Sequence, residues 1–211
     1  MLRRILLICG VVSSVLYAVV DVLGSLRYPG YRYTEQQFSE LTAQGSPVRP
    51  LMVALSVIPY TLLVAAFAVG VFTSAPKKRA GTITAAMLLG YAAFGMVGGW
   101  FTPMRTREAL AAGERGLRNA MHVPTTAVMS VFMVLAMGFG ATLLGKRFRY
   151  YSYATLAILI VFGVVTSLQA GKMVANEPTP WMGVTERINI YATMLWVAML
   201  AIGLLRAKET R

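Results

Sequence analysis

The sequence contains one histidine and one cysteine in 211 residues, and this scarcity excludes several kinds of chemistry. Zinc sites gather several histidine, cysteine or carboxylate ligands, and neither an HExxH nor a CxxC motif is present. One histidine cannot provide both axial ligands of a bis-histidine haem, and Cys9 alone cannot form a disulfide within the chain. Walker, Rossmann and GxSxG motifs are also absent, so the sequence predicts no metal, cofactor or nucleotide chemistry.

Charged residues are also few, at 13%, whereas 57% of the residues are hydrophobic. Soluble domains carry about 25% charged residues, so this composition is typical of a polytopic membrane protein. The 20 basic residues outnumber the 8 acidic ones, which by itself would suggest a nucleic-acid partner. Their placement along the chain indicates a membrane topology instead, and we expect no nucleic-acid binding.

Six long apolar stretches follow one another along the chain: Ile5–Leu26, Leu51–Phe72, Ile83–Phe101, Val123–Leu144, Tyr153–Leu168 and Ile188–Leu205. A helix needs roughly 20 apolar residues to cross a hydrocarbon core of about 30 Å. Strands of a membrane barrel would alternate with period two, and these runs do not. We therefore predict one all-α polytopic membrane domain over residues 1–211, with spans near 5–26, 51–72, 83–101, 123–144, 150–170 and 181–205.

Basic residues are distributed unevenly between alternate connections. The two termini and two short loops hold eleven basic residues and the single acid Glu209, whereas the three longer loops hold nine basic residues and six glutamates. The first group comprises Arg3, Arg4, Lys77, Lys78, Arg79, Lys146, Arg147, Arg149, Arg206, Lys208 and Arg211. By the positive-inside rule, both termini are cytoplasmic and the three longer loops are extracytoplasmic.

The first stretch resembles a cleavable signal peptide, because Arg3 and Arg4 precede an apolar run. Ala18 offers a small residue for cleavage. However, Leu16 fits poorly two positions before it, and the apolar run continues beyond it. We favour a retained first helix.

One face of the first helix carries small and polar residues at spacings of three or four: Gly10, Ser14, Tyr17, Asp21 and Gly24. We expect this face to point into the bundle. An ionised Asp21 is costly there unless it is paired. Two interpretations have equal weight: an aspartate that joins helices through hydrogen bonds, and an acid in a functional cavity.

Short helices at the membrane interface are predicted in the extracytoplasmic loops. Residues 34–37, beginning with Thr34, match a capping box and predict a helix that carries Ser39 and Glu40. Thr179 with Pro180 is typical of an N-cap and first-turn proline, so the sixth helix should begin near residue 181.

His122 lies where a charged loop meets the fourth apolar stretch. Glu114, Arg118 and His122 follow at four-residue intervals, so they share a face if the segment is helical. Pro124 would then sit in the first turn of the fourth helix. A lone histidine at an interface is more often a hydrogen-bonded structural residue than a catalyst.

Two helix-packing features are predicted within the apolar stretches. Pro59 predicts a kink, with Ser56 and Tyr60 placed to satisfy the carbonyl that the proline leaves free. Gly95 and Gly99 form a small-xxx-small pair that allows a neighbouring backbone to approach closely.

Polar residues occupy the extracytoplasmic or middle part of most stretches, whereas the cytoplasmic halves are nearly all aliphatic, alanine or glycine. This one-sided distribution predicts a polar pocket that opens to the extracytoplasmic side above a dry plug. A continuous aqueous channel is not expected.

Short motifs spread over most of the chain resemble the bacterial and archaeal six-helix membrane family catalogued as domain of unknown function 998. The matching residues are Tyr33, Ser39-Glu40-Leu41, Gly45-Ser46-Pro47, His122, Trp181-Met182-Gly183, Glu186-Arg187-Ile188 and Trp196. The resemblance implies six helices in a prokaryotic cytoplasmic membrane, with polar signature residues at the extracytoplasmic helix ends. It brings no assigned activity.

The leading hypothesis is a pocket that binds the polar end of a lipid-like or amphipathic molecule, with Arg187 as its anion-binding group. The other predicted site residues are Asp21, Ser39, Glu40, Arg118, His122, Glu186 and Asn189. A metal-free enzyme acting on a lipid or isoprenoid-like substrate is the alternative, with His122 as acid or base beside Glu40 or Glu186.

A proton-coupled carrier that uses Asp21 is a further alternative, although the dry cytoplasmic half argues against it. A structural accessory subunit is the last, and in that case the extracytoplasmic charges would form ion pairs. The expected partners are membrane lipids and an amphipathic small molecule. The sequence predicts no particular oligomeric state.

Overall fold

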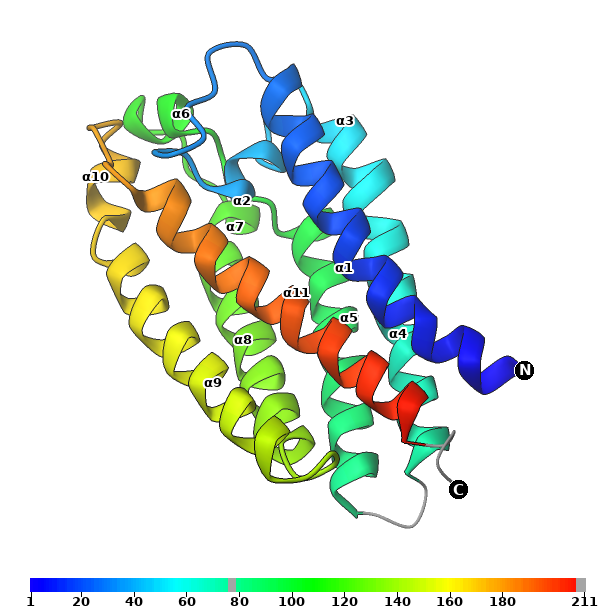
Figure 1. Ribbon diagram of the computed structural model, residues 1–211. Coiled ribbons are helices and arrows are strands. Elements are labelled where there is room, and N and C mark those ends of the chain that lie inside the picture. Colours follow the sequence, from blue (N-terminus) through cyan, green and yellow to red (C-terminus); the bar gives the residue numbers. More distant parts are fainter. Residues whose placement is uncertain (76–78, 208–211) are drawn as a thin grey trace.

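Residues 1–75 and 79–207 are described by a computed structural model, in which they form a bundle of helices (Figure 1). Six helical spans are long and apolar enough to cross a membrane. They are α1 (Leu2–Arg27); α3 (Arg49–Met52), the π-helical segment η1 (Val53–Val57) and α4 (Ile58–Ser74) as one span; α5 (Arg79–Phe101); α7 (Leu117–Ala120) with α8 (His122–Gly140); α9 (Lys146–Ser167); and α11 (Met182–Arg206). The prediction of a multi-pass, all-α membrane protein with six spans is therefore confirmed.

Part of the predicted topology depends on residues that lie outside the described ones, namely Lys77, Lys78, Lys208, Glu209 and Arg211. Two helix ends differ from the predicted spans: α8 ends at Gly140 rather than near residue 144, and α9 begins at Lys146 rather than near residue 150. The chain turns between them, and Gly145 adopts a φ of +93°, which favours glycine.

The spanning helices are arranged in a ring. α1 packs on α4, α4 on α5, α5 on α8, α9 on α11, and α11 returns to α1. α8 and α9 touch each other least of all the neighbours in the ring. Figure 1 shows them close together where residues 141–145 join them and separated toward the opposite end of the bundle. We call this gap in the ring the α8/α9 seam.

The two ends of the bundle differ in chemistry. The termini end holds the start of α1, the end of α11 and the α8–α9 connection. The polar end holds residues 28–48, 102–121 and 168–181, which include the short helices α2 (Phe38–Leu41), α6 (Arg107–Ala111) and α10 (Ala170–Val174). Short helices are thus present in the loops where the sequence predicts them.

The predicted face of α1 does point into the bundle. Asp21 and Gly24 are buried, and Tyr17 is half-buried. A side chain at Gly24 would not fit, because a Cβ there would lie 2.5 Å from Met52 Sδ. The absence of a side chain lets α1 and α3 pack closely, and in lipid this close contact, rather than water exclusion, holds helices together.

Apolar packing dominates the termini end. Trp196 of α11 is fully buried, with its ring centroid 6.0 Å from that of Phe148 on α9. Its Nε1 donates a hydrogen bond to Ser152 Oγ at 2.9 Å, which satisfies the only polar atom of the indole. Phe67 and Leu200 are buried in the same core.

The distortion predicted near Pro59 takes the form of the π-helical segment η1, which ends two residues before the proline. The role predicted for Tyr60 is wrong, because its hydroxyl bonds to that of Tyr91 at 3.0 Å instead of to a backbone carbonyl. Thr61 Oγ1 donates to the Val57 carbonyl at 2.6 Å. At Gly99 the space that a side chain would fill is taken by the Val57 side chain, whereas the sequence predicted the approach of a neighbouring backbone.

The predicted N-cap of α2 is three residues too early. Gln37, rather than Thr34, caps this helix, and Glu40 accepts a hydrogen bond from the Gln37 backbone N–H at 2.9 Å. Thr34 is used differently, since its carbonyl accepts from the backbone N–H of Val184 at 3.3 Å. This long-range contact packs the first loop against the start of α11.

Two further local predictions are wrong. Glu114 does not share a helical face with His122, because the chain turns between α6 and α7, where Gly113 has a φ of +82°. Thr179 does not cap α11, which begins at Met182. Instead Thr179 Oγ1 donates to the Glu35 carbonyl at 2.9 Å, because the loop before α11 folds over the first loop.

Candidate functional site

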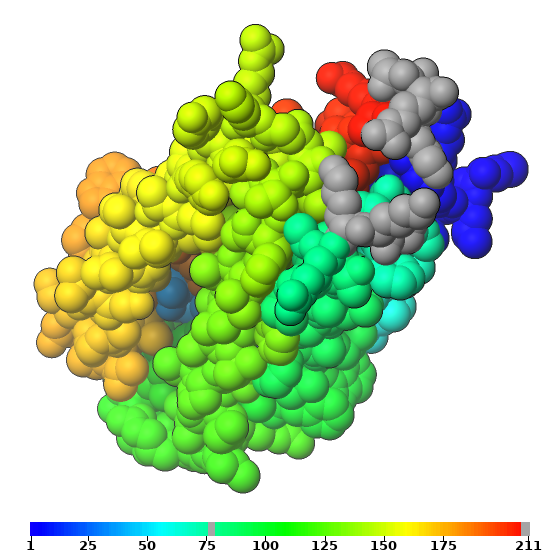
Figure 2. Space-filling view, turned by 90° about the horizontal axis from the view of Figure 1, so that it is seen from below, coloured from blue at the N-terminus to red at the C-terminus, as the bar shows by residue number. Residues whose placement is uncertain are grey.

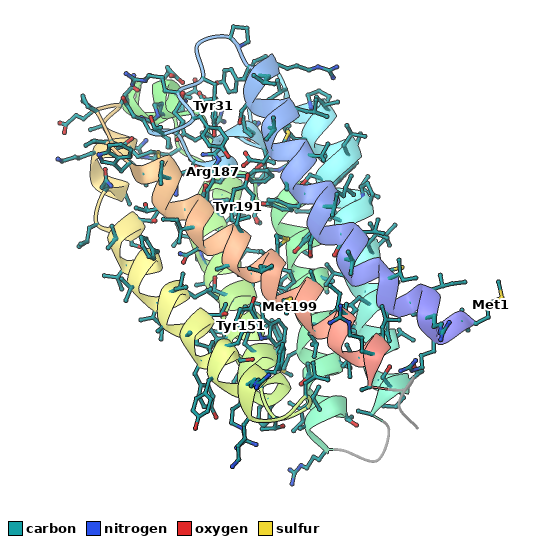
Figure 3. All side chains as sticks on the ribbon, viewed as in Figure 1. Met1, Tyr31, Tyr151, Arg187, Tyr191 and Met199 are labelled. Carbon is teal, nitrogen blue, oxygen red and sulfur yellow. The ribbon has the colours of Figure 1, made fainter. Side chains whose placement is uncertain are left out.

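Five of the predicted site residues come together at the polar end, where Figure 3 labels Arg187 between Tyr31 and Tyr191. α1 supplies Asp21, α2 supplies Ser39 and Glu40, and α11 supplies Glu186 and Arg187. They meet because the loop between α1 and α3 brings α2 into contact with both α1 and α11.

Apolar residues of α2 hold it in this position. Phe38 and Leu41 are buried, and the Phe38 ring stacks on Tyr17 of α1 with 4.4 Å between ring centroids. Val20 and Met52 belong to the same cluster. The polar side chains of α2 are therefore fixed relative to α1 and α11.

Asp21 and Arg187 form a buried ion pair. Arg187 donates to Asp21 Oδ1 from Nη2 and to Oδ2 from Nε, each at 2.9 Å. The hydroxyls of Tyr33 and Tyr191 donate to Oδ2 at 3.1 and 2.5 Å. A buried charge is stable only when it is paired and hydrogen-bonded, as here. This geometry favours the interpretation of Asp21 as a residue that joins helices over that of an open cavity acid.

The remaining donors of Arg187 are also taken by protein oxygens. Nη1 donates to the carbonyls of Tyr33 at 2.9 Å, Gln36 at 2.8 Å and Gly183 at 3.2 Å, and Nη2 donates to the Tyr31 hydroxyl at 2.8 Å. The Tyr33 ring lies 3.7 Å from the guanidinium carbon, within the range of a cation–π contact. Arg187 thus ties the first loop to α11, and this argues against its predicted use as an anion-binding group.

Tyr31 completes the enclosure of Arg187. Burial raises the pKa of its hydroxyl, although the charge and hydrogen bond of Arg187 act in the opposite direction. The protonated hydroxyl can donate to the carbonyls of Gln36 and Gln37, at 2.9 and 2.7 Å. Tyr31 therefore acts as donor and acceptor at the same junction.

Glu40 and Arg107 form a second buried ion pair. Arg107 Nε donates to Glu40 Oε2 at 2.8 Å and Nη2 donates to Oε1 at 2.6 Å, a bidentate geometry. Burial by itself lowers the pKa of Arg107, but the hydrogen bond and charge of Glu40 reverse this, and the net shift is upward. Arg107 was not a predicted site residue, because one arginine in a charged loop gives no periodic signal of burial.

Glu186 differs from these residues, because no ion pair links it to any cation among the described residues. Its carboxylate accepts hydrogen bonds from the Phe38 backbone N–H and, at 3.3 Å, from the Ser39 hydroxyl. It is half-exposed. Helical spacing places it on one face of α11 with Ile190 and Val197, the face that points to the interior of the ring.

His122 and Arg118 lie apart from the cluster. His122 Nδ1 bonds to the Thr102 carbonyl at 2.9 Å, so this nitrogen carries a hydrogen and fastens the start of α8 to the end of α5. Within the described part of the chain, no carboxylate contacts His122 in the way that acid–base catalysis was predicted to require. Arg118 is exposed on α7.

Asn189 faces α9 rather than the cluster. With its amide turned for hydrogen bonding, Nδ2 donates to the Ile158 carbonyl at 3.2 Å and Oδ1 accepts from the Gly163 N–H at 2.9 Å. On the same face, Thr166 Oγ1 donates to Thr185 Oγ1 at 2.8 Å. This polar face therefore holds α11 against α9.

The α8/α9 seam opens into the polar half of the bundle. Figure 2 shows a hollow between α9, in yellow, and α8, in yellow-green, with blue atoms of the N-terminal part of the chain at its base. Thr126, Ser130 and Val131, in the half of α8 nearer the polar end, are all exposed. On the interior face of α11, Glu186 and Ile190 are half-buried rather than fully buried.

A family model described as "Protein of unknown function (DUF998)" matches residues 11–203. The chain belongs to this family. The resemblance found in the sequence is thus confirmed, and the match includes part or all of each of the six spans. No curated protein and no solved structure matches the chain.

The chemistry available to this DUF998 protein depends on which charged side chains of its polar end are not already paired with one another. Asp21, Arg187, Glu40 and Arg107 neutralise one another. Over residues 1–75 and 79–207, no three His, Cys, Asp or Glu side chains are grouped so as to hold a metal ion. Glu186 remains without an ion pair among the described residues. Its carboxylate could accept hydrogen bonds from a molecule at the α8/α9 seam or form an ion pair with a cationic one.

Proposed function

We propose that this DUF998 protein binds an amphipathic molecule, which enters sideways from the membrane through the α8/α9 seam and places its polar group beside Glu186. In this proposal the polar end faces the extracytoplasmic side of a prokaryotic cytoplasmic membrane, with both termini in the cytoplasm. The uneven distribution of basic residues supports this orientation.

The observation that carries the proposal is a half-buried glutamate on the interior face of α11, within a ring of spanning helices that is open at the α8/α9 seam. Ionisable residues within membrane spans are rare and usually either pair with one another or serve a binding site. Asp21 and Arg187 belong to the first kind. Glu186 has no cation partner among the described residues and therefore fits the second.

The walls of the seam suit an apolar chain. Toward the polar end, Val128 and Val131 of α8 and Val164 of α9 expose much of their surface, as does Leu168 just beyond α9. An acyl or isoprenoid chain between these helices would replace contacts that α8 and α9 do not make with each other. The buried core at the termini end would limit how deep the chain can reach.

The polar group that fits best carries a hydroxyl or an amine. Both buried arginines of the cluster are already paired with carboxylates, so they offer no charge to a phosphate or a carboxylate. Glu186 can accept hydrogen bonds, and Ser39 beside it can donate or accept one. An anionic head group would gain no ion pair from Glu186.

The test is native mass spectrometry of lipids retained by the purified protein, with Glu186→Gln as the main variant. Glutamine keeps an oxygen for the Phe38 N–H but removes the negative charge, so the fold should be preserved. We expect Glu186→Gln to lose at least tenfold of the retained amphipathic molecule with little change in thermal stability. Glu177→Gln, at an exposed position in the loop before α11, is the matched control.

An unchanged lipid complement in Glu186→Gln would contradict the proposal and assign Glu186 to the fold alone. The orientation is tested separately in a Cys9→Ser background, by labelling a cysteine at position 114 with a membrane-impermeant reagent. Labelling from the extracytoplasmic side is expected. Labelling only from the cytoplasmic side would overturn the proposed topology.

A further inference from the structure

A second hollow lies on the surface of the polar end, with a volume of about 380 Å³. Its lining comes from three segments that are distant in sequence: the residues after α1, the start of α6 and the turn after α10. The side chains that matter are those of Tyr28, Arg32, Gln36, Arg107, Glu108 and Asn176. Glu186 does not line this hollow, so its chemistry can be judged independently of the seam.

The wall of the hollow contains two polar side chains that are almost fully buried. Arg107 is 3% exposed and Gln36 is 7% exposed. Glu40 fixes both of them, since it accepts hydrogen bonds from Arg107 Nε and Nη2 and from Gln36 Nε2. Rigid donors of this kind do not have to be ordered when a ligand binds, which favours affinity.

Some of this donor capacity is unused. A guanidinium has five N–H groups, and those of Arg107 make two bonds to Glu40 and one, at 3.3 Å, to Thr179 Oγ1. The remaining two N–H groups of Arg107, and one of Gln36, have no acceptor within the described part of the chain. Both residues line the hollow, so a ligand with hydroxyl or carbonyl oxygens could use these donors.

The charges around the hollow do not favour an anion. Arg107 is paired with Glu40, and Arg32 is paired with Glu35 at 3.1 Å. Glu108 lines the hollow with no ion pair to another described residue. The wall therefore carries no excess of positive charge, in contrast to the arginine clusters that bind phosphate.

Tyr28 adds an aromatic ring to these polar groups. Burial raises the pKa of its hydroxyl, with Glu108 and Glu40 adding to the shift and Arg107 opposing it, so the hydroxyl stays protonated. A protonated phenol both donates and accepts hydrogen bonds. Its ring offers a flat surface beside the planar side chains of Gln36, Arg107 and Asn176.

From this combination we propose that the hollow binds a neutral polyhydroxyl compound, such as a sugar or the glycan part of a larger molecule. A sugar presents hydroxyls that donate to Glu108 and accept from Arg107 and Gln36, together with a C–H face that can rest on Tyr28. The volume lies within the range of about 300–1,000 Å³ that is usual for small-ligand sites.

The test is isothermal titration calorimetry on the full-length protein in nanodiscs, with glucose, sucrose and inositol as probes. Inorganic phosphate and choline serve as the anionic and cationic comparisons. Saturable binding of at least one neutral probe, with a Kd at least tenfold lower than for either ion, is expected. Equal or tighter binding of phosphate or choline, or no saturable binding of any neutral probe, would overturn the proposal.

Two exposed lining residues allow the site to be altered without disturbing the buried pair. The double variant Glu108→Gln with Asn176→Gly removes one charge and one side chain, and glycine tolerates the φ of +54° at position 176. We expect it to weaken binding of the neutral probe at least tenfold, while Glu177→Gln binds like the wild type. Unchanged binding in the double variant would place the probe elsewhere, and Glu186→Gln should leave this binding intact.

Discussion

The two ends of the bundle both contain fully buried side chains, but they are held together by different forces. At the polar end, four charged side chains are each at most 3% exposed: Asp21, Glu40, Arg107 and Arg187. At the termini end, the largest fully buried side chains are apolar, among them Trp196, Phe67 and Leu200. Ion pairs fix direction and register, whereas apolar contacts in lipid provide only close packing.

This difference explains why the loops of the polar end are ordered around the helices. Arg187 holds the first loop through the carbonyls of Tyr33 and Gln36, and Arg107 joins α6 to α2 through Glu40. Removing one partner of such a pair should cost far more than removing an exposed charge. The four predictions below test this ranking, from the largest expected effect to the smallest.

The largest effect is expected for Arg187→Met. Without the guanidinium, Asp21 becomes a buried charge with no cation, which costs about 3–5 kcal/mol in the free energy of unfolding. Chemical unfolding in mixed micelles, followed by tryptophan fluorescence, measures the loss. The double variant Asp21→Asn with Arg187→Met should be less destabilised than Arg187→Met alone. Additive losses would show that the two residues do not act as a pair.

Arg107→Met should come next, with a loss of about 3 kcal/mol, near the lower end of the cost of breaking a buried pair. The effect is smaller because Arg187 also holds the first loop through two carbonyls, whereas the further hydrogen bond of Arg107 is one to Thr179 Oγ1 at 3.3 Å. The same unfolding measurement applies, with Arg118→Met as a control at an exposed position. Equal losses in the two variants would argue against a buried pair at Arg107.

At the termini end, Ser152→Ala should cost about 1–2 kcal/mol, because the Trp196 indole N–H would be left buried without an acceptor. A further Trp196→Phe change removes that donor. The share of the unfolding free energy that comes from this hydrogen bond should therefore be lost only once in the double variant. Double-mutant analysis of unfolding free energies measures this coupling. A coupling near zero would mean that the bond contributes little to stability.

The smallest effect is expected for Glu114→Gln, which breaks the pair with Arg105 at the polar end. The two charges are 2.5 Å apart, but Glu114 is 52% exposed and Arg105 is 27% exposed. Ion pairs in contact with water contribute about 0–1 kcal/mol, so we expect a change below about 0.5 kcal/mol. A loss comparable to that of Arg107→Met would show that burial does not set the ranking.

Much of the site could be located from the sequence, although its contacts could not. Asp21, Ser39, Glu40, Glu186 and Arg187 were all placed at one end of the bundle, from hydropathy and the alternation of basic loops. Arg107 was missed, since burial of a loop arginine depends on Glu40, which lies 67 positions earlier in the chain. His122 and Asn189 looked equally suited to a site, and only packing shows them bonded to α5 and α9.

By itself the sequence determined that the protein lies in lipid and that it spans the membrane with helices. Six apolar stretches require six helices, because lipid offers no hydrogen-bond partner to a free backbone group. The tertiary structure decided which charges neutralise each other and which one remains. Arg187 lies next to Glu186 in the chain, yet it pairs with Asp21, because successive residues of a helix point about 100° apart. That geometry leaves Glu186 without an ion pair to any residue in the described ranges, in a ring that is open between α8 and α9.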